Sequence, residues 1–345
     1  MRSAAQFLLA YARRDASGTL YTYPSNAHES NWDVRNPTTD VAAMHALFPA
    51  LIQAAAALNI DDEVVQAAKA ALTSLPDLPL MLPGTNALLA KNERTNPNAV
   101  IANSYNLTAI VHNQENLGLE PVWPYSLIGD DGPLHALGVR TFMQRTNKAM
   151  ADWSADPVQA ARLGLGEEMK TALHVVTERY QFYPSGLAQL TDAPEFYVEQ
   201  VGVVADALQN GLVQDYDGLV RIKAAWPDDW DADGTVVVQH GDKVHLQVRK
   251  GKIISLGVQA AQSGNLKMRN PWPGRAIKIV PNKQQPYIPT RDSKDTFTMK
   301  LQAEVSYRII PEQENEDQLP FAPVTGSLSM TPKKQGSRSI GLLAR

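Results

Sequence analysis

The sequence predicts an α+β protein in which a helical part comes first and a strand-rich part follows. Up to about residue 213, apolar residues recur at the spacing of amphipathic helices, and after Gly218 the spacing changes to two. Helices and strands that occur in separate blocks are typical of α+β chains or of two domains. We therefore predict a helical region at 1–213 and a β-sandwich-like domain at 214–345.

The composition is that of an ordinary globular protein, with 44% hydrophobic and 20% charged residues among 345. The net charge of -4 and the absence of a Lys/Arg cluster argue against a nucleic-acid partner. No uninterrupted apolar run approaches the ~18 residues of a membrane span, so we expect no membrane partner. The chain has no Cys, which excludes disulfides, thiolate metal sites and a Cys nucleophile.

The helical part opens with MRSAAQFLLAYARRD, whose apolar residues recur at helical spacing. Its apolar core is short for a signal peptide, so we predict the first helix of a packed domain. Thr39 can cap a second helix that carries Val41, Met44 and Leu51 inward. Asp61 or Asp62 starts a third helix that ends before Pro76.

Three further helices are predicted before the change of period. One covers Pro133 to Met150. Another starts at Asp156-Pro157, with Asp as the cap and Pro in the first position, and continues to Val176. The last runs from about Glu195 to Asn210, and Gly211 ends it.

The strand-rich part contains GTVVVQHGDKVHLQVRKGKIISLGV, which predicts three strands joined by a Gly-Asp turn and a Lys-Gly turn. Further on, DTFTMKLQAEVSYRII alternates apolar and polar residues throughout. That alternation predicts one strand with a buried face made of Phe297, Met299, Leu301, Ala303, Val305, Tyr307 and Ile309.

Candidate chemistry begins in the stretch YPSNAHESNWDVRNP at 23–37, which has the Glu29 carboxyl beside an aromatic residue. A carboxylic acid near an indole loses hydration, which favours the protonated form that a general acid needs. Amides can bond sugar hydroxyls and an indole can cover a pyranose ring. The candidate binding residues here are Asn26, His28, Asn31 and Trp32. The alternative is that these groups only cap helices and satisfy loop backbone.

A second polar cluster lies in VHNQENLGLEPVWPYSLIGDD at 111–131. His112 and Glu115 are three residues apart, but no third ligand follows at a recognisable spacing, so we predict no metal site. The mixture of amides, acids and aromatic residues suits a carbohydrate cleft better. The candidate binding residues are His112, Asn113, Glu115, Asn116 and Trp123.

The third candidate segment is PEFYVEQVGVVADALQNG at 194–211. Its apolar stripe predicts that Tyr197, Val201 and Leu208 face a core. Glu199 lies off that stripe in the first turn, where the helix dipole favours an ionised carboxylate. The alternative is that Glu199 is an ordinary residue that complements the dipole.

These three segments, in this order, resemble the C-terminal half of the (α/α)6-barrel enzymes of glycoside hydrolase family 95, which include α-L-fucosidases. The family's P-S-x-S-P-E-N loop is similar to Pro24-Ser25-Asn26-Ala27-His28-Glu29-Ser30, which implies that Glu29 is the general acid. Its H-R-H-x-S-H-L segment resembles residues 112–117, and its P-F-Q-I-D-G-N-F-G segment resembles residues 195–202. The family's Asp in that last segment corresponds to Glu199.

The resemblance implies part of an (α/α)6 toroid followed by a β-sandwich-like domain. A closed toroid needs about twice the helices seen here, so we predict that this chain is the C-terminal portion of a longer protein. An N-terminal segment of the same protein would then be its partner. The resemblance further implies export of relatives, although residues 1–15 predict no signal peptide.

The implied reaction is the hydrolysis of a glycosidic bond with inversion. Glu29 would protonate the leaving oxygen, and Glu199 would help water to attack the opposite face of the sugar. The substrate would be an oligosaccharide or polysaccharide, with no metal or organic cofactor. One alternative is a carbohydrate-binding or scaffold protein without catalysis. A phosphorylase is another, but it would need a basic anion site near Glu29 or Glu199, and the sequence suggests none.

Overall fold

The computed structural model describes residues 1–149, 151–189, 195–314 and 332–341, and its mixture of helices and strands confirms the α+β class. The chain divides into two compact units, Met1–Ser154 (unit 1) and Ala155–Arg345 (unit 2). The predicted change from helix to strand at residue 214 falls within unit 2. Unit 2 therefore contains helices as well as the main sheet.

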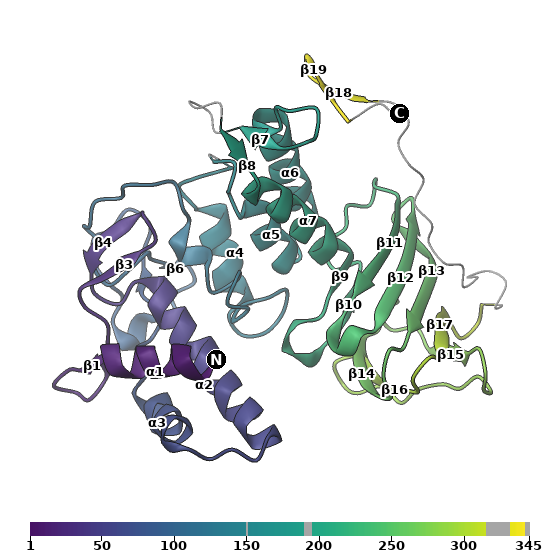
Figure 1. Ribbon diagram of the computed structural model, residues 1–345, viewed down its shortest axis with the longest axis horizontal. Coiled ribbons are helices and arrows are strands. Elements are labelled where there is room, and N and C mark those ends of the chain that lie inside the picture. Colours follow the sequence, from purple (N-terminus) through teal and green to yellow (C-terminus); the bar gives the residue numbers. More distant parts are fainter. Residues whose placement is uncertain (150, 190–194, 315–331, 342–345) are drawn as a thin grey trace. The chain divides into compact units, whose positions relative to one another are not determined.

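The described residues of unit 1 form four α-helices and three small two-stranded sheets (Figure 1). The helices are α1 (Arg2–Tyr11), α2 (Thr38–Ala57), α3 (Glu63–Ala71) and α4 (His135–Met143). The strand pairs are β1 (Arg13–Arg14) with β2 (Leu20–Tyr21), β3 (Ser25–Ala27) with β4 (Asn31–Val34), and β5 (Leu80–Met81) with β6 (Val100–Ile101). Short 3₁₀ turns cover Leu72–Ser74, Lys91–Glu93 and Leu117–Leu119.

The first three helices pack together around one hydrophobic cluster that includes Ala5, Met44, Phe48 and Val64. The predicted first helix is thereby confirmed as part of a packed unit. Within the described residues, α2 is the one helix whose length and apolar composition would suffice to cross a membrane. In the structure its Met44, Phe48 and Leu51 are buried against the neighbouring helices.

Polar residues begin and end these helices. Asp62 caps α3, as the sequence predicts, because its Oδ1 accepts hydrogen bonds from Val64 N and Val65 N, each at 3.0 Å. The expected cap at Thr39 is wrong, since α2 begins one residue earlier and Pro37 precedes it. The helix predicted to reach Met150 ends at Met143. There Arg145 Nη1 donates to Phe142 O at 2.6 Å, and its guanidinium lies over the Phe142 ring.

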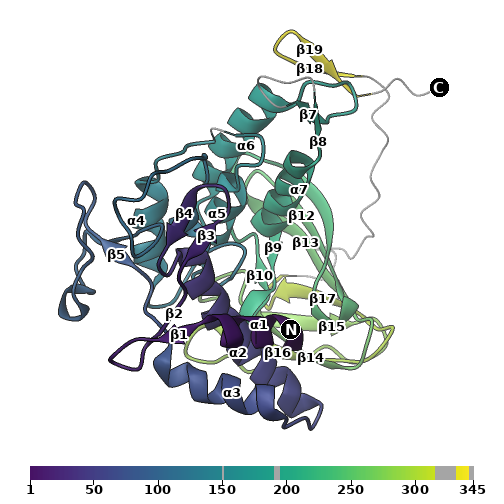
Figure 2. The ribbon, with the colours of Figure 1, turned by 60° about the vertical axis from the view of Figure 1, so that its left-hand side comes forward.

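The helices of unit 2 are α5 (Asp156–Arg162), α6 (Gly166–Tyr180) and α7 (Glu199–Leu212), and Figure 2 shows α6 and α7 close together. We predicted one helix from Asp156 to Val176, and this is wrong. Gly164 has φ +74°, a left-handed conformation that ends α5 before α6 begins. Asp156 is the first residue of α5, with Pro157 next, and Ala155 takes the cap position.

The predicted start of the last helix and its predicted inward face are also wrong. Phe196–Tyr197 forms strand β8, which pairs with β7 (Ala188–Gln189), and α7 begins only at Glu199. The buried face of α7 includes Gln200, whereas Val201 is 45% exposed. Gln200 Nε2 donates to Val176 O at 2.5 Å, so a polar side chain can be buried where the apolar pattern predicts solvent.

The main sheet of unit 2 has five antiparallel strands in the order β11-β12-β13-β17-β15. A separate ribbon pairs β14 with β16, and residues of sheet and ribbon share one hydrophobic cluster, as in a sandwich. The strands are β11 (Ala232–Val237), β12 (Lys243–Arg249), β13 (Lys252–Gln259), β14 (Gly264–Arg269), β15 (Ile277–Pro281), β16 (Thr296–Leu301) and β17 (Ser306–Pro311). Smaller pairs are β9 (Val213–Gln214) with β10 (Arg221–Ile222) and β18 (Lys333–Gln335) with β19 (Arg338–Ile340).

The three strands expected from GTVVVQHGDKVHLQVRKGKIISLGV are confirmed as β11, β12 and β13. Lys250 and Gly251, both with positive φ, form the turn between β12 and β13. The single strand expected from DTFTMKLQAEVSYRII is wrong, because it is two strands, β16 and β17. A turn at Gln302–Val305, in which Glu304 has φ +63°, sends β17 into the main sheet while β16 stays in the ribbon.

Polar side chains connect the helices of unit 2 to its first strands. The buried Gln214 of β9 donates from Nε2 to Ala161 O at 2.7 Å and to Asn210 O at 3.0 Å. In β10, Arg221 is 1% exposed and its guanidinium binds the Asp217 carboxylate at 2.9 and 3.0 Å. The Gln214 bonds therefore fix α5 and α7 to the start of the β region.

Candidate functional site

The stretch at 23–37, expected to be a loop, forms the hairpin β3–β4 and carries Glu29 at its tip. Ala27 pairs with Asn31, and Ser30 N donates to Ala27 O at 3.1 Å, which closes the turn. His28 takes a positive φ of 50°. Ala27 and Ser30 are buried whereas His28 and Glu29 are exposed, so the turn presents the acid to solvent.

The segment at 112–120 lies directly beside this hairpin. His112 N donates to Ser30 O at 2.8 Å, and the Trp32 and His112 rings stack with centroids 4.0 Å apart. Ser30 Oγ donates to Glu115 Oε2, and Asn113 Nδ2 donates to Glu29 Oε2 at 3.3 Å. We call Glu29, Ser30, Trp32, His112, Asn113 and Glu115 the hairpin cluster.

Asn113 connects two carboxylates of the hairpin cluster. Its Nδ2 lies 3.3 Å from Glu29 Oε2 and also 3.3 Å from Glu115 Oε1. The two carboxylate oxygens are therefore separated by no more than twice that distance. Glu29 is at the tip of the hairpin, and Glu115 is half-buried. Two carboxylates this close can divide the roles of proton donor and proton acceptor in general acid–base catalysis.

His28 makes a second carboxylate contact below the hairpin. Its Nε2 lies 2.5 Å from Oε1 of Glu120, whose side chain is only 10% exposed. The hydrogen bond to Glu120 raises the pKa of His28 above its ordinary value, although partial burial opposes this shift. Glu120 Oε2 has no hydrogen-bond partner within the described residues. This contact holds the backbone of the turn next to Glu29.

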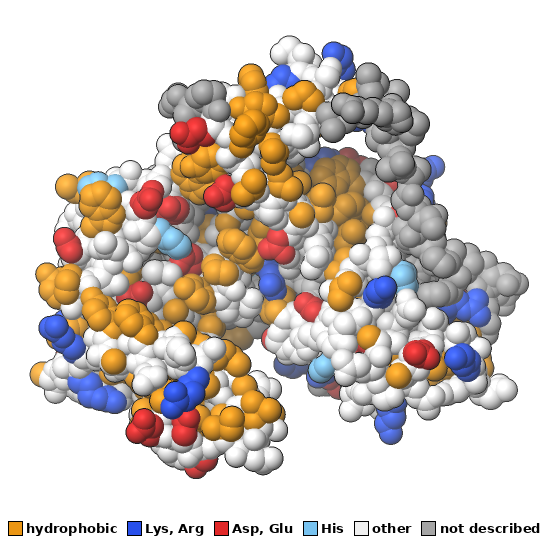
Figure 3. All heavy atoms as spheres, viewed as in Figure 1, with side chains coloured by type: hydrophobic (Ala, Val, Ile, Leu, Met, Phe, Trp, Pro, Cys, Tyr) orange, Lys and Arg blue, Asp and Glu red, His pale blue; other side chains and the backbone are white. Residues whose placement is uncertain are grey.

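Two cavities adjoin the hairpin cluster. One, of about 340 Å³, is lined by Asn31 and Glu115 together with several polar residues, Ser104, Asn106, Asn116 and Asn147. Asn31 is 2% exposed, and its Oδ1 has no hydrogen-bond partner in the described part of the chain. The other is an open depression of about 380 Å³ along Trp32 and His112, with Asp33 and Thr108 in its wall. Figure 3 shows acidic and hydrophobic side chains exposed together on the surface of this unit.

Other predicted residues have mainly structural contacts. Asn26 Oδ1 accepts from Asp33 N at 2.9 Å across the hairpin. Asn116 Nδ2 donates to Asn147 O at 2.7 Å, which orders the chain after α4. Trp123 lines neither cavity. These three residues are near the hairpin cluster in sequence or space, and Asn116 also lines the cavity of about 340 Å³, so their part in binding stays a prediction.

Glu199 belongs to unit 2, where it is the first residue of α7 and is exposed. Its predicted place in the first turn of a helix is confirmed. Glu29 belongs to unit 1, so their predicted cooperation stays a prediction.

Ser30 and Glu120 contact the candidate residues although the sequence did not identify them as site residues. Glu120 is an acid within the apolar run Leu117 to Val122, and a lone acid in such a run is a signal of a buried polar contact. Ser30 had no distinguishing signal apart from its position next to Glu29. Across the described residues, no group of three His, Asp or Glu side chains is arranged to hold a metal ion.

Comparison with known proteins gives little similarity. No family model matches the chain, and no curated protein matches it. One similar solved structure is a β-arabinofuranosidase of glycoside hydrolase family 127, with 13% identity and a TM-score of 0.25 over 85% of this chain and 43% of that one. Another is a family 127 β-L-arabinofuranosidase from Geobacillus stearothermophilus T6, with 10% identity and a TM-score of 0.23 over 79% and 41%.

This chain spans less than half the length of either solved structure. At TM-scores of this size, the two structures establish neither the fold nor the activity of this chain.

Proposed function

We propose that this chain is part of a glycoside hydrolase related to family 95, with the hairpin cluster as its sugar-binding site and Glu29 as general acid. The observation that carries the proposal is the shared contact of Asn113 with Glu29 and Glu115, beside the stacked Trp32 and His112 rings. Glycosidic hydrolysis needs a general acid and a second carboxylate, and an aromatic surface can hold the sugar ring beside them.

The aromatic surface supports a sugar rather than another polar ligand. Sugars present alternating hydroxyl-rich edges and apolar faces, so they suit a flat ring next to amides and carboxylates. Trp32 is 50% exposed although one of its faces is covered by His112. Asn31 Oδ1 and the other amides of the adjoining cavity offer acceptors and donors to hydroxyls.

Two residues are candidates for the second carboxylate, and they predict different stereochemistry. Glu199 is implied by the family resemblance and would act by inversion. Glu115 is supported by its contacts. Because Asn113 Nδ2 lies 3.3 Å from one oxygen of Glu29 and 3.3 Å from one oxygen of Glu115, these two oxygens are at most twice 3.3 Å apart. That upper limit allows the ~5–5.5 Å carboxyl spacing of retaining enzymes and barely reaches the ~6.5 Å lower limit of inverting enzymes. With Glu115, the configuration at the anomeric carbon would be retained.

The experiment follows hydrolysis of a panel of α- and β-glycosides by proton NMR, which identifies the anomer first released. Glu29→Gln should lower kcat/KM about 10²- to 10⁴-fold for an alkyl leaving group. It should lower kcat/KM much less for a dinitrophenyl leaving group, which needs no proton. Activity loss in Glu199→Gln with an inverted product would support Glu199, and loss in Glu115→Gln with a retained product would support Glu115.

A carbohydrate-binding protein without catalysis is the alternative function. It predicts that sugars bind with the same affinity to wild type and Glu29→Gln, and that no glycoside of the panel is hydrolysed. We also propose that helices α1–α7 are a portion of an (α/α)6 toroid. A longer chain with additional N-terminal helices that hydrolyses a glycoside on which residues 1–345 are inactive would support this proposal.

A further inference from the structure

A basic groove lies on the outer face of the β14–β16 ribbon, in unit 2 and separate from the hairpin cluster. The groove has a volume of about 820 Å³ and lies between the ribbon and the segment 284–292. Its wall includes Lys267, Tyr287, Arg291, Thr298 and Lys300. A cavity of this size is in the ~300–1,000 Å³ range of small-molecule sites.

Side chains along the two strands of the ribbon point alternately into the core and away from it, and two of those on the outer face are lysines. Leu266, Met268 and Met299 are buried in the core of the unit. Lys267 and Lys300 project from the opposite face, where Lys267 is opposite Thr298 in register and Lys300 is two residues further along β16. Residues in such diagonal positions lie on one surface, ~7–8 Å apart.

The positive charge of this face is only partly neutralised. Lys267 Nζ lies 3.6 Å from Asp292 Oδ2, and this ion pair is weak because the two side chains are 48% and 44% exposed. Within the described residues, Lys300 has no carboxylate within 4.0 Å. Arg291 is held by Asp295 at 2.7 Å. The ammonium group of Lys300 is therefore available to an anionic ligand, and that of Lys267 is available once it leaves its weak pair with Asp292.

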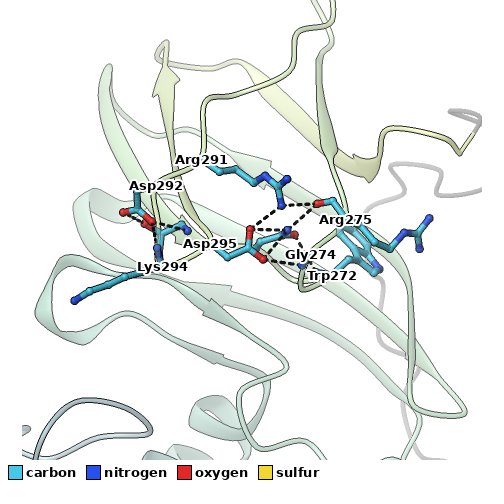
Figure 4. Close-up of polar contacts among 9 residues, drawn as sticks. Trp272, Gly274, Arg275, Arg291, Asp292, Lys294 and Asp295 are labelled. Atoms are coloured by element: carbon cyan, nitrogen blue, oxygen red, sulfur yellow. Dashed lines mark hydrogen bonds and ion pairs between the residues drawn. The ribbon is translucent and has the colours of Figure 1, made fainter.

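The loop that forms the far wall is fixed by two aspartates, as Figure 4 shows. Asp292 accepts hydrogen bonds from Lys294 N at 2.9 Å, Thr296 N at 3.0 Å and Thr296 Oγ1 at 2.7 Å. Asp295 accepts from Gly274 N at 2.9 Å and from Arg291 Nη1 at 2.7 Å. These hydrogen bonds within the chain hold this part of the wall in place, which reduces the entropy lost on binding.

The remaining groups of the groove suit hydroxyls and a ring face. Gln284, Gln302, Thr290 and Thr298 supply amides and hydroxyls, and the half-buried Tyr287 supplies an aromatic ring. A ligand that matches all of them carries carboxylates for the lysines, hydroxyls for the amides and a saturated ring for the tyrosine. Uronic acids have these three features.

We propose that this groove binds an acidic polysaccharide, with Lys267 and Lys300 pairing with carboxylates of neighbouring uronate residues. The preference for a sugar polymer over other polyanions rests on the proposed glycosidase function. Such a site would keep a polymeric substrate on the protein without taking part in bond cleavage. It depends on none of the residues of the hairpin cluster.

The test measures binding of the full chain to polygalacturonate by isothermal titration calorimetry, with neutral dextran as the control polymer. The double variant Lys267→Ala/Lys300→Ala should lose about tenfold in affinity, because two charge pairs are removed. The matched control is Lys243→Ala/Lys252→Ala, which makes the same charge change at exposed positions of β12 and β13. Its affinity should equal that of wild type, and binding should weaken as salt rises.

Several results would overturn the inference: no binding by wild type, equal losses in both double variants, or equally tight binding of a single-stranded DNA of similar length. The last outcome would mean unspecific attraction to polyanions. Glu29→Gln separates this inference from the proposed function. If polygalacturonate binds that variant and wild type equally while wild type hydrolyses no glycoside of the panel, the groove stands and the glycosidase proposal fails.

Discussion

Trp32 and His112 lie face to face, with ring centroids 4.0 Å apart and ring planes 12° apart. They come from the hairpin and from the segment at 112–120, which the hydrogen bond from His112 N to Ser30 O joins. The imidazole covers one face of the indole and orients it. The stacked pair therefore offers a rigid surface beside Glu29, and rigid aromatic surfaces bind with little loss of side-chain entropy.

Replacing this indole tests whether the surface binds sugars. Trp32→Ala should weaken glycan binding about tenfold, since aromatic contacts are worth ~0.5–1.5 kcal/mol beyond buried area, and Trp32→Phe should lose less. Calorimetric titration with the best ligand of the glycoside panel gives the affinities. Phe7→Ala, which removes a 64% exposed aromatic residue of α1, is the control. Equal affinity of Trp32→Ala and wild type would contradict a sugar-binding role.

A charge added at Asn113 tests whether Glu29 and Glu115 act together. Asn113→Asp would place a third carboxylate beside both, and like charges disfavour ionisation of their neighbours. We expect the acidic limb of the pH–rate profile to move to higher pH and kcat/KM to fall about 10²-fold, as when a catalytic group is displaced by ~1 Å. Gln114→Glu makes the same charge change at the next, exposed position. A pH profile that shifts equally in both variants would argue against a specific pair.

The contact of His28 with Glu120 predicts a pH-dependent stability. The pKa of His28 is raised in the folded protein, so its stabilisation is complete below the ordinary value near 6.5 and is lost as pH rises through the raised value. Glu120→Gln should therefore lower the melting temperature more at pH 5.5 than at pH 8.5. Between the two pH values, the effect of the substitution on the free energy of unfolding should differ by at most about 1 kcal/mol, since His28 is about half exposed. A difference that grows towards high pH would contradict this assignment.

The contacts of Asp292 predict a stability that depends on pH in the opposite direction. Hydrogen bonds from Thr296, first through its hydroxyl and then through its backbone N–H, lower the pKa of Asp292 from 3.8 to about 2. Its stabilisation is thus present above about pH 4 and is lost as pH falls towards 2. The melting temperature of Asp292→Asn should lie below that of wild type at pH 7, and the gap should close in acid. Thr296→Val, which lacks the hydroxyl donor, should show a smaller gap with the same pH trend.

Asp62 should stabilise the start of α3. Asp62→Ala removes the acceptor for Val64 N and Val65 N and the ion pair with Arg2 at 2.7 Å, which should destabilise the first turn of α3. Hydrogen exchange of the α3 amides should become faster. Asp61→Ala, which loses only exposed contacts to Lys69 and Gln66, should change exchange little. Similar exchange in both variants would mean that the cap contributes nothing.

Local sequence signals predicted those parts of the fold that depend on neighbours along the chain. The period of apolar residues gave the order of helices and strands, and Lys250-Gly251 marked a turn because Gly tolerates positive φ. The pattern missed the turn at Gln302–Val305 because the alternation of apolar residues continues through it. Only the pairing of β17 with β13 and β15, rather than with β14, shows where one strand ends.

In the candidate site too, local sequence signals identified some features, whereas contacts between distant segments were not predicted. Residue types identified Glu29, Trp32, His112 and Asn113 as candidates, but their contacts join segments more than seventy positions apart, which one sequence does not specify. Hydrophobic patterning also failed on α7, where a buried Gln200 is stabilised by a carbonyl of α6. Polar groups become compatible with burial through such partners, and the partners are set by tertiary structure.

The bonds of Gln214 have a consequence for dissecting this protein by truncation or limited proteolysis. A fragment that begins at residue 214 would leave the Gln214 Nε2 without the carbonyls of Ala161 and Asn210, and it would lack the Leu212 side chain that packs beside Gly234. A fragment that begins at Ala155 keeps all of these contacts. The place where a chain changes its type of secondary structure can thus differ from the place where it can be cut and still fold.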